Sequence, residues 1–215
     1  MHFGLTLGSE NLHALPSGAL YWPAQKLLVV SDLHLGKSHR LARRAGQLLP
    51  PYESRATLQK LDADIAALRP ATVVCLGDSF DDLESADSLD SADSLLLAQA
   101  MAGREWIWVE GNHDPGPLDL GGTHRAELKI SGLSLRHIAN PSERYEISGH
   151  FHPKARLAGQ AKPCFLVDDQ RLIMPAYGAY TGGLWTESPA LTSLMQPRAL
   201  AILTGTKARA IPMPR

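Results

Sequence analysis

The segment Leu27-Leu28-Val29-Val30-Ser31-Asp32-Leu33-His34 constrains the fold of this chain more than any other. Its first four residues are apolar and two of them are β-branched, which is typical of a buried strand. Asp32 and His34 follow two residues apart, so an extended backbone would project both side chains to the same side. Ligands collect at the carboxyl ends of strands in open α/β sheets. A carboxylate and an imidazole at this position therefore predict half of a metal site.

Four later segments repeat this arrangement, because each predicted strand runs into residues that can bind a metal. These residues are Asp78 after strand 72–76, Asn112, His113 and Asp114 after strand 106–109, His137 after strand 133–136, and His150 and His152 after strand 145–148. Taken singly, each has a simpler explanation, such as a turn residue or a surface histidine. Random placement would not put such side chains at five successive strand ends, so we predict one shared site.

The chemistry of this set narrows the choice of metal. Carboxylate, imidazole and amide groups without thiolate suit Mn best and also Zn, Fe, Co or Ni, and they argue against a structural zinc site. Even seven of these nine side chains would be too many ligands for one ion and about right for two. Two ions roughly 3.5–4 Å apart can clamp the attacking and leaving oxygens of a phosphoryl group. One carboxylate must then bridge the two ions.

The remaining pattern predicts an α/β protein. We expect a strand at residues 3–7 paired in a hairpin with residues 19–22, helices at residues 52–68 and from about 91 to 101, and one strand at residues 125–130. Further strands are expected at residues 155–157, 165–167, 172–174, 200–203 and 207–211. Early strand–helix alternation followed by many strands predicts two sheets packed face to face with helices outside. A chain of 215 residues without a recognisable linker predicts a single domain over residues 1–215.

Net charge by itself neither supports nor excludes any partner. A formal net charge of −1 gives no general basic surface for nucleic acid, so such binding must depend on a local patch. Arg40, Arg43 and Arg44 share one face of a predicted helix close to the first ligands. A solvated helix face and a clamp for phosphate oxygens are equally favoured for these arginines. The acidic residues between 81 and 93 count mildly against a broad DNA-binding surface.

Nothing in the sequence suggests export or a membrane. The first 15 residues lack the basic and apolar regions of a signal peptide, and no apolar run has membrane-spanning length. The two cysteines, Cys75 and Cys164, are expected to be reduced, although a disulfide between them stays open. We therefore expect a cytoplasmic protein.

The motifs Asp32-Leu33-His34, Gly77-Asp78, Gly111-Asn112-His113-Asp114, His137 and Gly149-His150-Phe151-His152 resemble, in order, those of the calcineurin-like metallophosphoesterases. The resemblance implies a four-layer α/β/β/α sandwich, with two mixed sheets flanked by helices. It implies that Asp32, His34 and His152 hold one metal, that Asn112, His137 and His150 hold the other, and that Asp78 bridges them. It also implies that His113 acts on the leaving or non-bridging oxygen, and that Asp114 orients the His113 ring.

Four segments resemble a narrower subfamily, the ligase-associated DNA damage response endonucleases. They are residues 31–38, 49–52, 149–153 and 175–184. This resemblance implies DNA as the substrate and an association with a DNA ligase and a helicase. One difference is that an imidazole is expected near position 81, where this chain has Asp81-Asp82. The substrate contacts of that loop therefore stay open.

Together these features predict a dinuclear metal-dependent phosphodiesterase, namely a nuclease acting in DNA repair. A metal-bound hydroxide would attack phosphorus in line, while Arg40, Arg43 and Lys154 would hold flanking phosphates. A phosphodiesterase or pyrophosphatase for small nucleotides would use the same central chemistry and remains the alternative. A metal-bound scaffold without catalysis is the least favoured hypothesis, because no ligand of the family set is missing.

Overall fold

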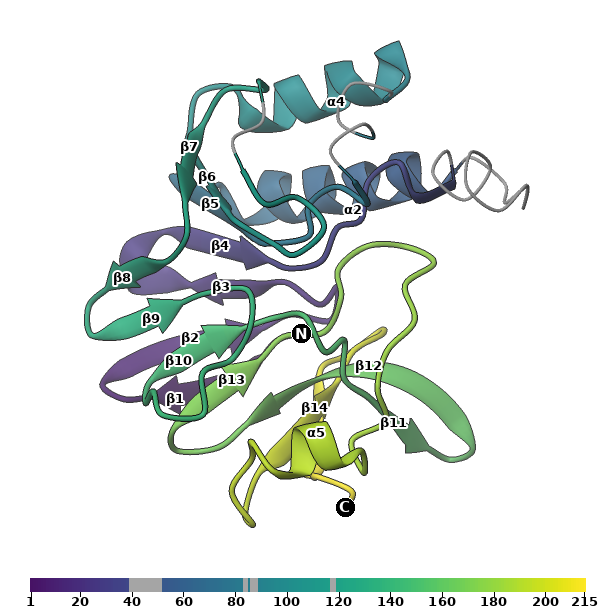
Figure 1. Ribbon diagram of the computed structural model, residues 1–215. Helices are drawn as coiled ribbons and strands as arrows, with labels where there is room; N and C mark the ends of the chain where they lie inside the picture. The colour runs from purple at the N-terminus through teal and green to yellow at the C-terminus, as the bar shows by residue number, and fades with distance from the viewer. Residues whose placement is uncertain (39–51, 83–84, 86–88, 117–118) are drawn as a thin grey trace.

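Two mixed β-sheets, stacked face to face, form the centre of the computed structural model (Figure 1). The structure describes residues 1–38, 52–82, 85, 89–116 and 119–215. The first sheet has the order β1 (Phe3–Leu7), β2 (Glu10–Ala14), β3 (Leu20–Trp22), β4 (Leu27–Val30), β5 (Thr72–Leu76), β6 (Glu105–Val109) and β7 (Thr123–Arg125). Strands β4 to β7 run parallel, and β1 to β4 alternate in direction.

The second sheet contains the later strands. Its order is β15 (Arg209–Pro212), β14 (Leu200–Leu203), β12 (Gln160–Val167), β13 (Arg171–Ile173), β10 (Glu146–Ser148), β9 (Leu133–Leu135) and β8 (Leu128–Ile130). Strand β11 (Lys154–Leu157) pairs with β12 and forms a hairpin that projects from the sheet (Figure 1). Strands β9, β10 and β13 are parallel, so the end of β9 and the end of β10 lie at one edge.

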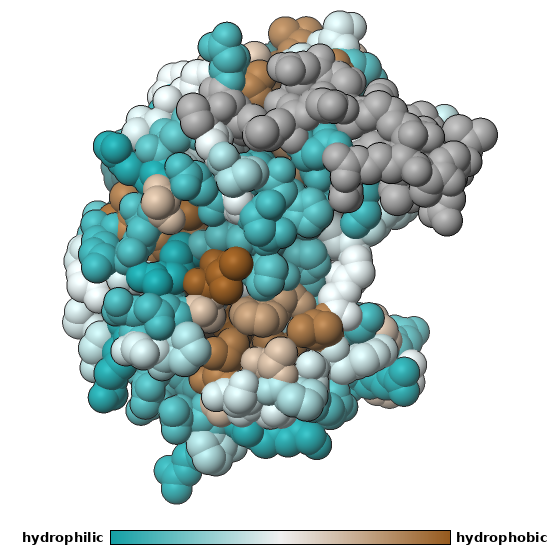
Figure 2. Space-filling model, viewed as in Figure 1, coloured by the Kyte–Doolittle hydropathy of each residue, from teal (hydrophilic) through white to brown (hydrophobic). Residues whose placement is uncertain are grey.

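Alternate residues of a strand face opposite sides of its sheet, and this explains how the sheets and helices form layers. In β4, Leu27 and Val29 pack into the core between the sheets, whereas Leu28 and Val30 pack against the helices. These helices are α2 (Glu53–Leu68) and α4 (Ser91–Met101). A third apolar cluster covers the outer face of the second sheet beneath the short helix α5 (Pro189–Thr192). The predicted four-layer sandwich is confirmed, with a thin fourth layer. Most of the face seen in Figure 2 is hydrophilic, because the apolar side chains lie inside these layers.

The helices match the predicted periodicity. Leu58, Leu61 and Ile65 are buried on one face of α2, as the spacing of apolar residues predicts. The carboxylate of Asp90 accepts hydrogen bonds from the backbone N–H groups of Ala92 and Asp93 and caps the start of α4. Among the residues described, no helix combines the length and apolar character needed to cross a bilayer.

Two predictions about the strands were wrong. Residues 3–7 pair with the unpredicted strand β2, which in turn pairs with β3. Residues 125–130 are not one strand, because β7 belongs to the first sheet and β8 to the second. Three-residue strands are too short for their periodicity to be recognised. The predicted helix with Arg40, Arg43 and Arg44 lies outside the described residues.

Close packing joins the two sheets where their loops meet. Gly77 follows β5 with a φ of +78°, and a Cβ atom there would lie 2.4 Å from Nδ1 of His137, which follows β9 in the other sheet. Gly132 has a similar φ of +81° in the turn between β8 and β9, but a Cβ atom there would have no neighbour within 4 Å. A comparison of substitutions at these two glycines therefore separates the cost of backbone strain from the cost of steric overlap.

We expect Gly77→Ala to destabilise the protein by roughly 2–5 kcal/mol, the sum of left-handed strain and overpacking. Gly132→Ala should cost only the strain, about 1–2 kcal/mol. Urea unfolding of the two variants beside wild type measures the difference. Equal losses would show that the space next to His137 does not constrain the loop.

Candidate metal centre

The ligand-type side chains predicted from the sequence lie on adjoining loops of the two sheets. In the first sheet, the backbone N–H groups of Asp32 and His34 donate to the carbonyls of Gly77 and Asp78, at 3.1 and 3.0 Å. In the second sheet, the N–H of Gly149 donates to the carbonyl of His137 at 2.9 Å. The loops after β4 and β5, and those after β9 and β10, are therefore held together in pairs by backbone hydrogen bonds.

The backbone at these positions is left-handed, not extended. Positive φ angles, between 46° and 69°, occur at Asp32, His34, Asp78, His150 and His152. Asp32 and His34 thus converge through two left-handed residues, which corrects the extended geometry expected from their spacing. Such conformations cost about 1–3 kcal/mol each in non-glycine residues and persist only where the surroundings enforce them. Strain of this kind at several neighbouring residues is characteristic of a functional site.

The first ligand cluster consists of Asp32, His34 and His152, whose ligand atoms lie within 4.8 Å of one another. Nε2 of His152 is 3.0 Å from Oδ1 of Asp32. Nδ1 of His34 is 3.0 Å from Oδ1 of Asp81, and both side chains are buried. An ionised carboxylate only accepts hydrogen bonds, so this Nδ1 carries the proton and Nε2 keeps a lone pair. That Nε2 is buried without a hydrogen-bond partner among the described residues, as expected for a metal ligand.

The second ligand cluster consists of Asp78, His137 and His150, together with Asn112. Nδ1 of His137 donates to the carbonyl of Leu76 at 3.0 Å, which leaves a lone pair on Nε2 of the neutral ring. This Nε2 lies 3.0 Å from Oδ1 of Asn112, 3.3 Å from Oδ2 of Asp78 and 3.3 Å from Nδ1 of His150. Four atoms of the ligand type thus converge on one region, where a proton on Nε2 or a bound metal ion would balance the charge of Asp78.

Burial and neighbouring groups shift the pKa values of His137 and Asp78. Burial favours the neutral form of His137, but the carboxylates of Asp78 and Asp32 outweigh it and raise the pKa of His137 to about 8. Burial also opposes ionisation of Asp78, but His137 and the N–H of His113 hold the pKa of that carboxyl well below its usual range. The carboxyl group of Asp78 therefore stays ionised, and its negative charge favours a positive charge beside it. The donor types and the unpaired Nε2 of His34 fit divalent metal ions.

The carboxylate of Asp114 has a different role from the one expected. It accepts hydrogen bonds from the backbone N–H groups of Gly111, Asp78, Ser79 and Phe80, at 2.7–3.2 Å. Nδ1 of His113 instead lies 2.9 Å from the carbonyl oxygen of Asp81. The expectation that Asp114 orients the His113 ring is therefore corrected, because its oxygens join the loops after β5 and β6. Burial is the main cause that raises the pKa of Asp114 to about 6.

Asp81 belongs to the site, although the sequence does not predict it. The sequence marks Asp81 only as a difference from the subfamily, yet its carboxylate contacts His34 and its carbonyl oxygen contacts His113. Histidine ligands commonly donate their second ring nitrogen to a carboxylate. A search for a carboxylate partner of each histidine could have suggested Asp81, although spacing does not identify which one.

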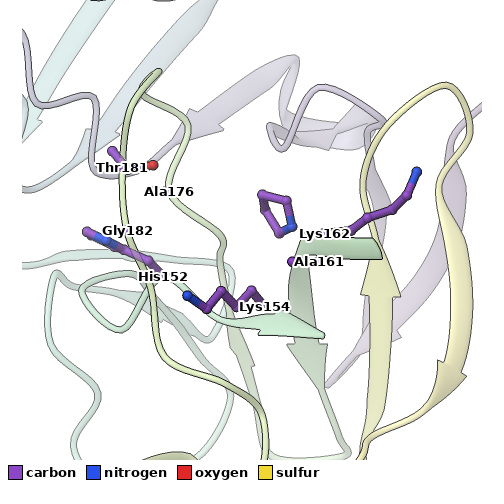
Figure 3. Close-up of a pocket in the computed structure, with 8 residues that line it drawn as sticks. His152, Lys154, Ala161, Lys162, Ala176, Thr181 and Gly182 are labelled. Atoms are coloured by element: carbon purple, nitrogen blue, oxygen red, sulfur yellow. The ribbon is translucent and has the colours of Figure 1, made fainter. Parts of the chain in front are cut away.

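A pocket of about 200 Å³ opens beside the first ligand cluster and is lined by His152, Lys154, Lys162 and Thr181 among others. Figure 3 shows the ammonium group of Lys154 on the side of His152, whereas Lys162 points the other way. Lys154 is thus placed next to the cluster, as its proposed contact with substrate requires. Arg40 and Arg43, the other two predicted phosphate contacts, lie outside the described residues.

Comparisons with known proteins agree with this geometry. The chain is similar to the crystal structure of nuclease MPE from Pseudomonas putida, with a TM-score of 0.79 and 25% identity over 98% of this chain and 100% of the other. A search of curated proteins finds no match. Residues 25–187, which include every predicted ligand, match the family described as calcineurin-like phosphoesterase. The chain therefore belongs to the calcineurin-like phosphoesterases.

Proposed function

We propose that this protein is a metal-dependent phosphodiesterase that cleaves nucleic acid, with DNA as its substrate. The observation that carries the proposal is the convergence of metal-ligand side chains from both sheets on adjoining loops. Paired sites of this kind suit phosphoryl transfer, in which negative charge develops on several oxygens.

The ligands divide between two ions. Asp32, His34 and His152 would hold one ion. Asn112, His137 and His150 would hold the other, with Asp78 between them. When bound, such ions lower the pKa of a water molecule and neutralise charge on the phosphoryl oxygens. Mn suits the donor set best, and Zn, Fe, Co and Ni also fall within its range.

His113 is placed to serve the leaving oxygen. Its Nδ1 lies against the Asp81 carbonyl, which only accepts hydrogen bonds, so Nδ1 carries a proton. The ring packs edge to face on His34, with 5.3 Å between centroids. Nε2 could then hold a proton toward the substrate, and a charged ring could deliver it to the departing oxygen.

Nucleic acid as the substrate is supported by two observations. The similar protein from Pseudomonas putida is named a nuclease, and the two chains match over nearly their full lengths. Lys154 lies beside His152, where it could contact a phosphate next to the scissile bond. A role in DNA repair, with a ligase and a helicase as partners, is proposed from the sequence resemblance alone.

Hydrolysis assays test the proposal directly. Protein reconstituted with Mn should cleave single-stranded, double-stranded or nicked DNA, and it should also hydrolyse bis-p-nitrophenyl phosphate. Turnover of nucleotide diphosphates without any cleavage of DNA would favour the small-molecule alternative. Stoichiometric metal binding without turnover of any substrate would favour a scaffold.

Replacing Asp81 should weaken metal binding, although Asp81 is not itself proposed as a ligand. Asp81→Leu removes the acceptor that fixes the His34 ring, and loss of such a partner typically lowers metal affinity about 10–100-fold. Asp81→Asn keeps an acceptor oxygen and should lose less. Competition with a chromogenic chelator measures both affinities. Wild-type affinity in Asp81→Leu would exclude the orienting role.

Replacing His113 should slow the reaction without loss of metal. General acid catalysis is typically worth about 10²–10⁴ in rate, so His113→Ala should lose roughly that factor in kcat. The loss should shrink for a diester with a good leaving group, which needs no proton.

His150→Ala is the control for the His113 variant, because it should lose metal and activity together on every substrate. Elemental analysis after reconstitution separates the two cases. If His113→Ala also comes out short of metal, His113 belongs among the ligands.

A further inference from the structure

Two cationic side chains of the β11–β12 hairpin, beside the candidate metal centre, lie against the same aromatic ring, that of Trp185. Lys154 and Arg156 alternate along β11 with the buried Ala155 between them, so they project from the same face. Nζ of Lys154 lies 4.6 Å, and Cζ of Arg156 lies 4.4 Å, from the ring centroid of Trp185. Both distances are within the range of cation–π contacts.

This arrangement is fixed relative to a proposed metal ligand. The backbone N–H of Lys154 donates to the carbonyl of Leu184 at 2.9 Å, and the N–H of Thr186 donates to the carbonyl of Lys154 at 3.1 Å. Gly183 packs so closely that a Cβ atom there would lie 2.0 Å from the carbonyl oxygen of His152. The segment with Trp185 is therefore tied to β11 and to His152, and the two cations sit at a set position from the first ligand cluster.

Lys154 and Arg156 hold two positive charges close to one ring. Among the described residues, neither side chain forms an ion pair with a carboxylate. Two like charges held on one ring repel each other, and a cation–π contact returns only about 0.5–2 kcal/mol. An anion bound between them would remove this repulsion.

Further cations follow on the other side of the hairpin. Lys162 of β12 lines both the pocket beside His152 and a second pocket of about 160 Å³, which Lys207 and Arg209 also line. A single phosphate at the metal centre would need Lys154 at most. Arg156, two residues further along β11 than Lys154, offers a second contact to a strand that continues beyond the centre.

We propose that the β11–β12 hairpin, with Lys154 and Arg156 held by Trp185, binds the phosphate backbone of a nucleic-acid strand as it leaves the metal centre. This inference rests on the proposed function, because it takes nucleic acid as the substrate. Contacts of this kind position the strand without reading its sequence. Arg156 does not line the pocket beside His152, so a small nucleotide held in that pocket would not need it.

Binding of a fluorescein-labelled single-stranded DNA oligonucleotide, measured by fluorescence anisotropy without added metal, tests the hairpin separately from catalysis. The double variant Lys154→Gln with Arg156→Gln should bind roughly 10- to 30-fold more weakly at 0.1 M salt. Its plot of log affinity against log salt should be less steep by about 1.4, since each phosphate contact on a single strand contributes about 0.7.

Two further variants serve as controls. Lys154→Arg with Arg156→Lys keeps both charges and should keep the salt dependence. Arg198→Gln removes an exposed cation just before β14, away from the hairpin, and should bind as wild type does. Unchanged affinity and slope in the double Gln variant, or an equal loss in Arg198→Gln, would overturn the inference.

Cleavage assays with Mn then distinguish the two proposals. The double Gln variant should lose a larger factor in activity on DNA than on bis-p-nitrophenyl phosphate, which has no flanking phosphate for the hairpin to hold. Equal loss on both substrates would contradict the inference, because the hairpin would then act on the metal centre itself. Wild-type protein that binds the oligonucleotide through the hairpin but cleaves no nucleic acid would contradict the proposed function alone.

Discussion

The convergence of ligand-type atoms from the two sheets is the constraint on which the rest of this structure depends. Nε2 of His137 faces an amide oxygen, a carboxylate oxygen and a second imidazole nitrogen, all at 3.0–3.3 Å. Nε2 of His34 is buried without a hydrogen-bond partner in the described part of the chain. Folding brings these atoms together at a cost that bound cations would offset. The loops of this fold therefore bring together side chains that bound metal ions would stabilise.

The scaffold enforces this geometry from both sheets. Loops after β4 and β5 are joined by backbone hydrogen bonds, and the buried carboxylate of Asp114 fastens the loop after β6 to that after β5. His137 arrives from the second sheet and fits only because Gly77 has no side chain. The core between the sheets therefore has a functional role, since it sets the distance between the two groups of loops. Left-handed backbone at five of the proposed ligands is the strain that this packing sustains.

Much of this could be predicted from residue type. Apolar β-branched runs that end in Asp, Asn or His identify strands and ligands together, so the sheets, the helices and the clustered side chains were foreseen. Spacing could not reveal loop geometry, which explains the errors over Asp114 and over the extended form of Asp32 and His34. Asp81 was missed because its partner is chosen by tertiary contact, not by sequence distance. Strands β7 and β8 have three residues each, too few to show a period of two, and β2 contains no β-branched residue and no Phe, Tyr or Trp.

The measurement that tests this account most directly is an anomalous diffraction map from crystals grown with Mn. The account predicts two peaks, one within ligand distance of Asp32, His34 and His152 and the other of Asn112, His137 and His150. Asp78 should lie between peaks about 3.5–4 Å apart, as in other two-metal sites. A single peak in catalytically active crystals, or peaks away from these side chains, would contradict it.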